Sequence, residues 1–256
     1  MITAGVDVGA ATTKALILKG HEILSFFVIP TRGDVVRAAD EATRRVLAIA
    51  GLPFENIDRV VSTGYGRNSV PFSHKAITEI ACHARGAKFL FSEAKMVMDI
   101  GGQDSKAIRL SEDGRVEDFV MNDKCAAGTG RFLEVMAAVL GLRLEALGEI
   151  SSKSEKPCLI SSTCTVFAES EVVSLRAEKK AVEDILAGIH QSIAKRMSSM
   201  VIPMGLVQPV VFTGGVAKNS GVIRALEGDL KVKLIVPQEP QIIGALGAAL
   251  FANTES

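Results

Sequence analysis

Two hydrophobic periodicities divide the chain into strands and helices. Short apolar runs flank Gly-containing turns within residues 6–18 and 98–110, and each stretch predicts a pair of strands. Residues 34–51 have apolar positions at helical spacing, open at Asp34 as the N-cap and end at Gly51. The same spacing predicts helices over 75–89, 130–141, 166–180, 181–202 (stopping at Pro203) and 242–252. Because the strands come in groups before the helices, the pattern predicts a mixed α/β fold.

An internal repeat relates the two predicted strand pairs. The stretch "VDVGAATTKALIL" matches "MDIGGQDSKAIRL" 92 residues later, with Asp7 on Asp99 and Lys14 on Lys106. The agreement continues past the turn, which favours two related lobes over two unrelated hairpins that share Asp-x-Gly by chance. Each lobe would then offer turn amides to phosphate oxygens and a carboxylate to Mg²⁺.

Composition narrows the possible functions. The 256-residue chain has 29 basic and 29 acidic residues, whereas a nucleic-acid-binding protein usually carries a basic excess. Aromatic residues make up 5% of the chain, which argues against stacking platforms for bases. Since no apolar run reaches transmembrane length and "ITAGVDVG" does not resemble a signal peptide, we expect a cytoplasmic protein.

Several motifs together resemble one branch of a large ATPase superfamily. The strand–Gly-Gly–helix stretch "FTGGVAKN" and the two Asp-x-Gly hairpins resemble the actin, sugar-kinase and heat-shock-chaperone superfamily. Within it, "STGYGRN", "DIGGQDSK", "NDKCAAGTGRF" and "TCTVFAESE" resemble the ATP-dependent activators of 2-hydroxyacyl-CoA dehydratases and the ATPase subunits of benzoyl-CoA reductases. The resemblance implies an actin-like (ribonuclease H-like) α/β ATPase with two duplicated lobes around a nucleotide cleft. We expect lobe I over 1–94, with 240–256 packing back on it, and lobe II over 95–239.

The resemblance also implies an activity and its cofactors. It implies a homodimer that hydrolyses ATP with Mg²⁺ and transfers low-potential electrons through one [4Fe–4S] cluster shared by the two subunits. The donor would be a ferredoxin or flavodoxin, and the acceptor an acyl-CoA dehydratase or reductase component. Each subunit would supply two cluster ligands, Cys125 and Cys164.

The cysteine pattern is compatible with that implication. Four cysteines are too few for a disulfide scaffold, and they contain no Cys-x-x-Cys. Cys82, inside a predicted helix, and Cys158, before an expected strand at "LISS", are interpreted as core residues, and His83 as a packed or surface histidine. Cys125 and Cys164 instead lie at loop-to-helix boundaries in small, polar surroundings. A two-fold dimer would complete four thiolates, although a zinc site and a redox-inactive pair remain alternatives.

The remaining site residues take their roles from the superfamily resemblance. We expect phosphate contacts from Ala10, Ala11, Thr12, Thr13 and Lys14, and from Gly101, Gly102, Gln103 and Asp104. We expect Asp7 and Asp99 near Mg²⁺ or the attacking water, which Gln103 would orient. Gly128, Thr129 and Gly130 would sense the nucleotide, while Gly214, Gly215, Asn219 and Gln241 would contact it on the adenosine side.

Three points stay open from the sequence. The family usually has Ser-Thr where this chain has Ala10-Ala11, so hydroxyl contacts to phosphate would be lost there. Lys106 would either contact phosphate or point outward from its strand. A small-molecule or sugar kinase of the same superfamily, and a pure nucleotide switch, are alternative functions.

Overall fold

The computed structural model describes residues 1–254. It divides into two units, each made of several chain segments. The first unit comprises 1–97, 108–118 and 237–256, and the second comprises 98–107 and 119–236. No helix of the described chain is both long enough and apolar enough to cross a lipid bilayer.

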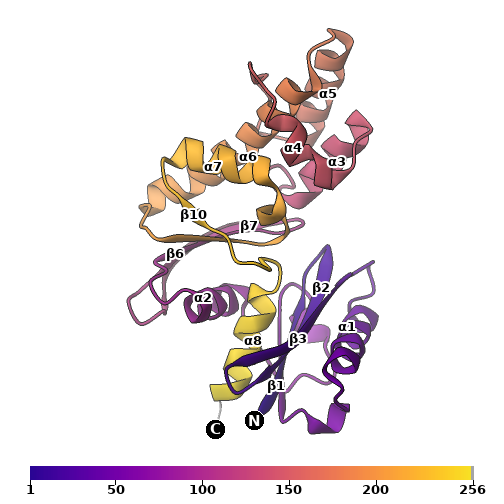
Figure 1. Ribbon diagram of the computed structural model, residues 1–256, viewed down its shortest axis with the longest axis vertical. Coiled ribbons are helices and arrows are strands. Elements are labelled where there is room, and N and C mark those ends of the chain that lie inside the picture. The colour runs from indigo at the N-terminus through magenta and orange to yellow at the C-terminus, as the bar shows by residue number, and fades with distance from the viewer. Residues whose placement is uncertain (255–256) are drawn as a thin grey trace. The chain divides into compact units, whose positions relative to one another are not determined.

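The two sheets have the same strand order, and Figure 1 labels β1, β2 and β3 of the first sheet and β6, β7 and β10 of the second. The first contains β1 (Ile2–Val8), β2 (Thr12–Lys19), β3 (Glu22–Pro30), β4 (Arg59–Thr63) and β5 (Lys75–Ala76) in the order β3-β2-β1-β4-β5. The second contains β6 (Met96–Ile100), β7 (Ser105–Leu110), β8 (Val116–Asn122), β9 (Val210–Thr213) and β10 (Leu234–Ile235) in the order β8-β7-β6-β9-β10. Each strand therefore matches the one five places earlier, so the repeat read from two hairpins extends to whole sheets.

Side-chain alternation along β2 builds the core of the first unit on both faces of its sheet. Ala15 and Ile17 face the cluster that includes buried residues of α1 (Val35–Ala50). Leu16 and Leu18 face the opposite cluster, formed with α8 (Ile243–Thr254). Neighbouring residues of a strand point to opposite faces, so one apolar run serves two helix layers.

Small residues let α8 approach its neighbours closely. α2 (Glu79–Leu90) packs on α8, and a side chain at Gly247 would overlap the carbonyl oxygen of Cys82. On the strand side, a side chain at Gly5 would overlap the backbone of α8 at Ala245. Glycine is therefore required where backbone approaches backbone, and α8 is fixed between β1 and α2.

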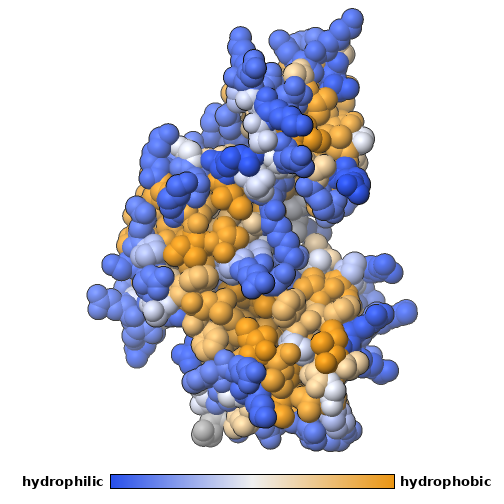
Figure 2. Space-filling view, viewed as in Figure 1, coloured by the Kyte–Doolittle hydropathy of each residue, from blue (hydrophilic) through white to orange (hydrophobic). Residues whose placement is uncertain are grey.

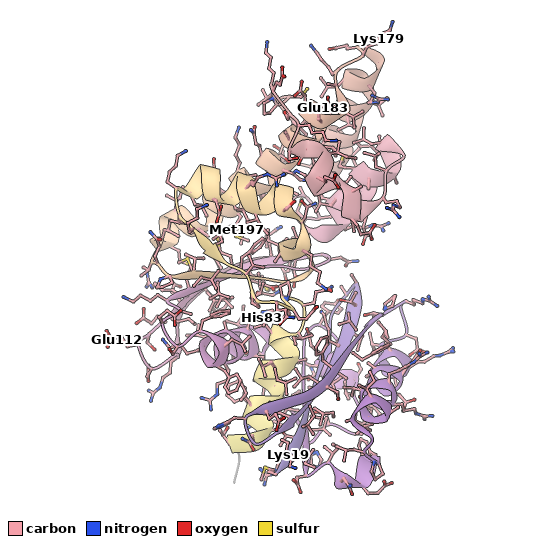
Figure 3. The ribbon with its side chains drawn as sticks, viewed as in Figure 1. Lys19, His83, Glu112, Lys179, Glu183 and Met197 are labelled. Carbon is pink, nitrogen blue, oxygen red and sulfur yellow. The ribbon has the colours of Figure 1, made fainter. Side chains whose placement is uncertain are left out.

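Most helices of the second unit follow the sequence pattern. They are α3 (Gly130–Leu140), α4 (Leu147–Ser151), α5 (Thr165–Ala177), α6 (Val182–Met204) and α7 (Ser220–Leu230). α6 and α7 pack together, and Met197 of α6 is buried, whereas Lys179 is exposed in the turn that precedes α6 (Figure 3). The sequence predicts that α6 stops at Pro203. Instead, Pro203 lies inside the helix, whose last residue is Met204 and whose C-cap is Gly205. In the first unit, both predicted caps of α1 are confirmed. Asp34 is the N-cap and accepts the Arg37 amide, and Gly51 is the C-cap with a left-handed backbone conformation.

The expected strand at "LISS" is also wrong. This segment is irregular, and the Ser161 amide donates to a side-chain oxygen of Glu171 at 2.7 Å. The residues just before it are held by Asp184 at the start of α6. The Asp184 carbonyl accepts the Cys158 amide at 2.9 Å, and its side chain accepts the hydroxyl of Ser154 and the amides of Glu155 and Lys156. Cys158 is half-buried rather than a fully buried core residue. Hydrogen bonds to a helix terminus replace the ladder that a strand would need.

Changing Gly247 to Ala tests the packing of α8. The added methyl must push α2 away from α8, so we expect a loss of about 1–3 kcal/mol in the free energy of unfolding. Gly228→Ala in α7 is the matched control, because open space surrounds that position and the same change should gain about 0.5–1 kcal/mol. Urea denaturation measures both, and equal effects of the two substitutions would contradict this packing.

Acid should destabilise the second unit through His190. This residue of α6 is buried, and neither ring nitrogen has a hydrogen-bond partner among the described residues. Burial, with a smaller effect of Arg224, lowers the pKa of His190 from 6.5 to about 4. The unfolded chain therefore binds a proton that the folded one excludes, and stability falls as pH drops from about 6.5 to about 4.

The His190→Leu variant should lack that part of the pH dependence, which amounts to about 3 kcal/mol. The variant His21→Leu, at an exposed position, serves as the control and should lose as much stability between pH 7 and pH 4 as the wild type. Denaturation curves at pH 7 and pH 4 decide the matter, since identical losses in wild type and His190→Leu would exclude His190 as the cause.

Candidate nucleotide and thiolate sites

The first Asp-x-Gly loop is a tight turn closed by backbone and side chain. The Gly9 amide donates to the Thr12 carbonyl at 3.1 Å, and Lys14 Nζ lies 3.1 Å from Asp7 Oδ2. Asp7 is 2% exposed at the end of β1. Its other oxygen, Oδ1, has no hydrogen-bond partner among residues 1–254. A buried carboxylate oxygen without a partner is costly, so this atom is suited to receive a water molecule or a cation.

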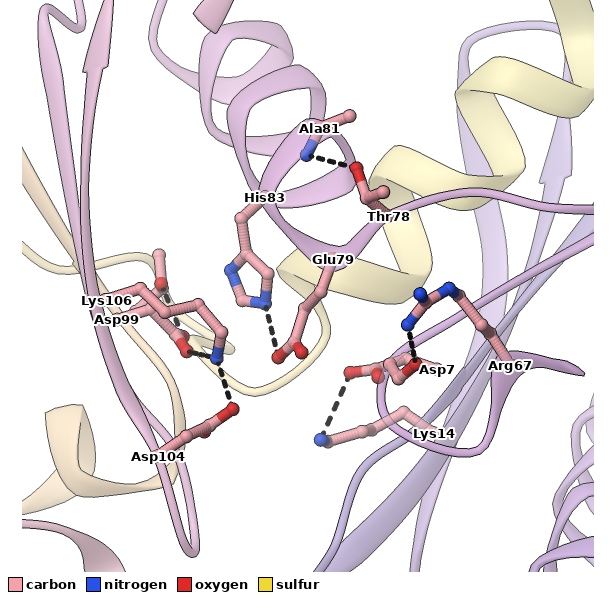
Figure 4. Close-up of polar contacts among 12 residues, drawn as sticks. Asp7, Lys14, Arg67, Thr78, Glu79, Ala81, His83, Asp99, Asp104 and Lys106 are labelled. Atoms are coloured by element: carbon pink, nitrogen blue, oxygen red, sulfur yellow. Dashed lines mark hydrogen bonds and ion pairs between the residues drawn. The ribbon is translucent and has the colours of Figure 1, made fainter. Parts of the chain in front are cut away.

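The second loop repeats this geometry at the same spacing. The Gly101 amide donates to the Asp104 carbonyl at 2.9 Å, and Lys106 Nζ lies 3.2 Å from Asp99 Oδ2 (Figure 4). Asp99 is also 2% exposed, and its Oδ1 accepts the Thr213 hydroxyl at 2.8 Å. The turn bond and the ion pair therefore recur in both copies, which supports the duplication read from the sequence.

Lys106 points inward, so the outward alternative is wrong. It is completely buried and bridges two carboxylates, Asp99 at 3.2 Å and Asp104 at 2.8 Å. A lysine without exposure stays charged only when paired, and here two acids share it. Lys14, its counterpart in the first loop, keeps a side chain that is 14% exposed.

A second pair of repeated glycines was not recognised in the sequence. Gly64 follows β4 and Gly214 follows β9, both with positive φ, at 85° and 88°. A side chain on Gly64 would overlap Asp7 Oδ1, and one on Gly214 would lie 2.9 Å from Asp99 Oδ1. Each glycine therefore lets a strand end approach the loop carboxylate. The sequence signal for this pair is a Thr-Gly dipeptide at the end of an apolar strand, which occurs twice with a separation of 150 residues.

Backbone hydrogen bonds join the second loop to the segment that carries Cys125. The Gly130 amide donates to the Gly101 carbonyl, and the Arg131 amide to the Gly102 carbonyl, both at 2.8 Å. Thr129 is buried, and its hydroxyl donates to the Ala126 carbonyl at 2.6 Å. The start of α3 is thus tied directly to the predicted phosphate loop.

The two candidate cysteines lie on loops that touch each other. Cys125 Sγ is 3.8 Å from the carbonyl oxygen of Thr163, the residue before Cys164. Cys164 is the N-cap of α5, and both thiols belong to half-buried residues. Cys82 differs, because burial raises the pKa of its thiol to about 12. The interpretation of Cys82 as a core residue is confirmed.

The other predicted contacts are distributed as follows. Thr13 is buried with its hydroxyl 3.0 Å from that of Thr31, so its backbone is better placed for a ligand than its side chain. Asn219 caps α7 by accepting the amides of Gly221 and Val222. Gln103 is exposed, and Gln241 is half-buried in the turn before α8. Their roles toward a nucleotide stay predictions.

Comparison with known proteins assigns the chain to a family. The sequence model of the BadF/BadG/BcrA/BcrD ATPase family matches residues 4–252. The chain belongs to this ATPase family. The family inferred from the motifs is therefore confirmed.

Individual relatives agree in sequence and fold. The (R)-2-hydroxyglutaryl-CoA dehydratase activating ATPase of Acidaminococcus fermentans is 46% identical over 252 residues, covering 98% of this chain and 96% of that protein. The solved activator of the 2-hydroxyisocaproyl-CoA dehydratase from Clostridium difficile, with bound ADPNP, has a TM-score of 0.95 and 47% identity, covering 99% of this chain and 94% of that one. A ROK family glucokinase from Streptomyces griseus, at 14% identity and TM-score 0.61 over the full length of both chains, shows the fold alone. The actin-like fold class is confirmed.

Lys106→Met tests the buried ion pair. The substitution leaves the Asp99 and Asp104 carboxylates without their cation, so we expect a loss of about 3 kcal/mol or more in stability. Lys14→Met, at the more exposed position, should cost less. Urea denaturation of the two variants compares them directly, and a larger loss for Lys14→Met would overturn this ranking.

Proposed function

We propose that this chain is a reductive activator. It hydrolyses ATP to drive electrons from a reduced ferredoxin or flavodoxin, through a [4Fe–4S] cluster shared by two copies, to an acyl-CoA dehydratase or related reductase. The observation that carries the proposal is the pairing of Cys125 and Cys164 on loops joined to a phosphate-type turn. Activators of two such dehydratases among the relatives support the choice of acceptor.

The repeated loops support the ATPase part. Each is a tight Gly-containing turn beside a buried carboxylate, an arrangement in which turn amides can bind phosphate oxygens and the carboxylate can bind hydrated Mg²⁺. In the first loop, the unpartnered Asp7 Oδ1 suits a metal-bound or attacking water. In the second, Asp99 pairs with Lys106 through Oδ2 and accepts the Thr213 hydroxyl at Oδ1, and we propose that it acts on Mg²⁺ through a water molecule. Hydrolysis by water relies mainly on such positioning and electrostatics.

The thiols present fit half of a cubane cluster. Such clusters take four thiolates, and this surface offers Cys125 and Cys164 on adjacent loops. When bound, the cluster would supply one-electron chemistry at low potential. A second copy related by a two-fold axis would supply the other two thiolates.

An exposed apolar surface beside Cys164 supports dimerisation there. Apolar side chains gather on the surface over α5 (Figure 2), where Val166, Phe167 and Val173 are more than half exposed. Only Ala168 and Val172 of this helix are buried within the chain. A helix that leaves large apolar side chains in water gains stability when a partner covers them.

Nucleotide state would reach the thiols through the start of α3. The carbonyls of Gly101 and Gly102 hold the amides of Gly130 and Arg131, so a shift of the phosphate loop would move α3 and the Cys125 turn with it. Differential binding of ATP and ADP would provide the free energy for that shift.

Anaerobic purification with cysteine variants tests the proposal. The wild type should contain about four iron and four sulfide per dimer, because two copies complete one cubane. Cys125→Ala and Cys164→Ala should lose the iron, whereas Cys158→Ala should keep it. An iron-free wild type, or one in which Cys125→Ala retains full iron, would refute the cluster; phosphorylation of a sugar by such a preparation would favour a kinase.

A further inference from the structure

One arginine of α6 contacts both cysteine-bearing loops. The stem of Arg196 packs against Gly128, where an added side chain would approach its Cγ to 2.9 Å. Its Nη2 donates to the side-chain oxygen of Asn122 at 3.5 Å, and its Nη1 donates to the carbonyl of Ser162 at 3.4 Å. Arg196 is thus in contact with chain segments on both sides of Cys125 and with the segment before Cys164.

The two residues that accept hydrogen bonds from Arg196, Asn122 and Ser162, lie close to Cys125 and Cys164 respectively. Asn122 donates from its amide nitrogen to the Cys125 carbonyl at 2.9 Å, so one amide side chain links the guanidinium to the Cys125 turn. Ser162 lies two residues before Cys164, and the intervening Thr163 carbonyl contacts Cys125 Sγ at 3.8 Å. These contacts close a ring from Arg196 through both loops.

The base of that ring is rigid. Arg196 lies in the 23-residue helix α6. Ile193, three residues before it, and Met197, directly after it, are both buried. A side chain whose helix is packed in the core has a fixed origin, so its donors lie at fixed positions relative to the sheet. Both cysteine loops have irregular backbone, and the Cys125 loop also contains Gly128, so they need such an anchor.

We propose that Arg196 is a positioning residue that sets the distance and orientation between Cys125 and Cys164. The proposal rests on the proposed function in treating the two thiols as a ligand pair. Guanidinium is suited to this task because its planar fork donates in two directions at once, to Asn122 and to Ser162. Lysine, with a single ammonium group on a flexible stem, cannot hold both acceptors in one geometry. The same contact favours glycine at position 128, since the aliphatic stem of Arg196 occupies the space that a larger residue's side chain would need there.

Hydrogen–deuterium exchange on the metal-free protein tests the positioning. In Arg196→Met, amides in both 121–128 and 161–164 should exchange about three- to tenfold faster, the effect of losing hydrogen bonds of modest strength. Arg196→Lys should recover part of the protection. Lys195→Met, at the exposed neighbouring position, is the matched control and should leave both segments unchanged. If Arg196→Met does not fold, Asn122→Ala replaces it and should accelerate exchange in 121–128.

In Arg196→Met, acceleration in only one segment, in neither, or to the same extent as in Lys195→Met would overturn the proposal. In Asn122→Ala, unchanged exchange in 121–128 would overturn it. A second measurement addresses the ligand pair itself: the electron paramagnetic resonance spectrum of the reduced, iron-loaded protein should change in Arg196→Met and remain wild-type in Lys195→Met. An unchanged spectrum in Arg196→Met would also overturn the positioning role. If the wild type binds no iron, the proposed function fails, while the exchange measurement still decides whether Arg196 holds the loops.

Discussion

An ion pair between a lysine and a buried aspartate at the end of the first strand of each repeat fixes where the loops lie. Lys14 holds Asp7, and Lys106 holds Asp99, at nearly equal distances of 3.1 and 3.2 Å. The acid comes from one strand of a hairpin and the lysine from the other, so the pair closes the turn between them. Because a buried charge without a partner is costly, the turn cannot open without losing this compensation. The ion pair therefore fixes the shape of each loop.

The two copies have diverged around this shared pair. In the second, Thr213 and Asp104 complete the contacts of Asp99 and Lys106, which gives a fully paired and buried network. In the first, one oxygen of Asp7 has no hydrogen-bond partner in the described chain. A fully paired network is rigid, whereas an unpaired carboxylate oxygen is available to a ligand. The two copies thus differ in pairing: the first keeps a carboxylate oxygen without a hydrogen bond to the described residues, and the second is fully paired and bonded to the cysteine segment.

Local signals were the predictable part of this protein. The Asp-x-Gly turns, the caps of α1 and the boundary position of Cys164 depend on neighbouring residues, and the structure has them where the sequence placed them. The direction of Lys106 was not predictable, because strand periodicity does not say which acids surround a side chain. The contacts of Arg196 were not predictable either, since Asn122 and Ser162 are far from it in the chain. The strand expected after Cys158 is absent, and there the Ser161 amide donates to the side chain of Glu171 instead of to a neighbouring strand.

The proposed coupling between the loop 101–104 and the two thiols depends on two backbone hydrogen bonds, from the Gly130 amide to Gly101 and from the Arg131 amide to Gly102. The most direct measurement is the rate at which an iron chelator removes iron from the anaerobically purified protein, with ATP and with ADP at saturating concentration. If nucleotide state moves the cysteine segment, the two rates differ, and the Asp7→Ala variant, impaired in the ATP response but not in its thiols, abolishes the difference. Equal rates with ATP and ADP in the wild type would contradict the coupling.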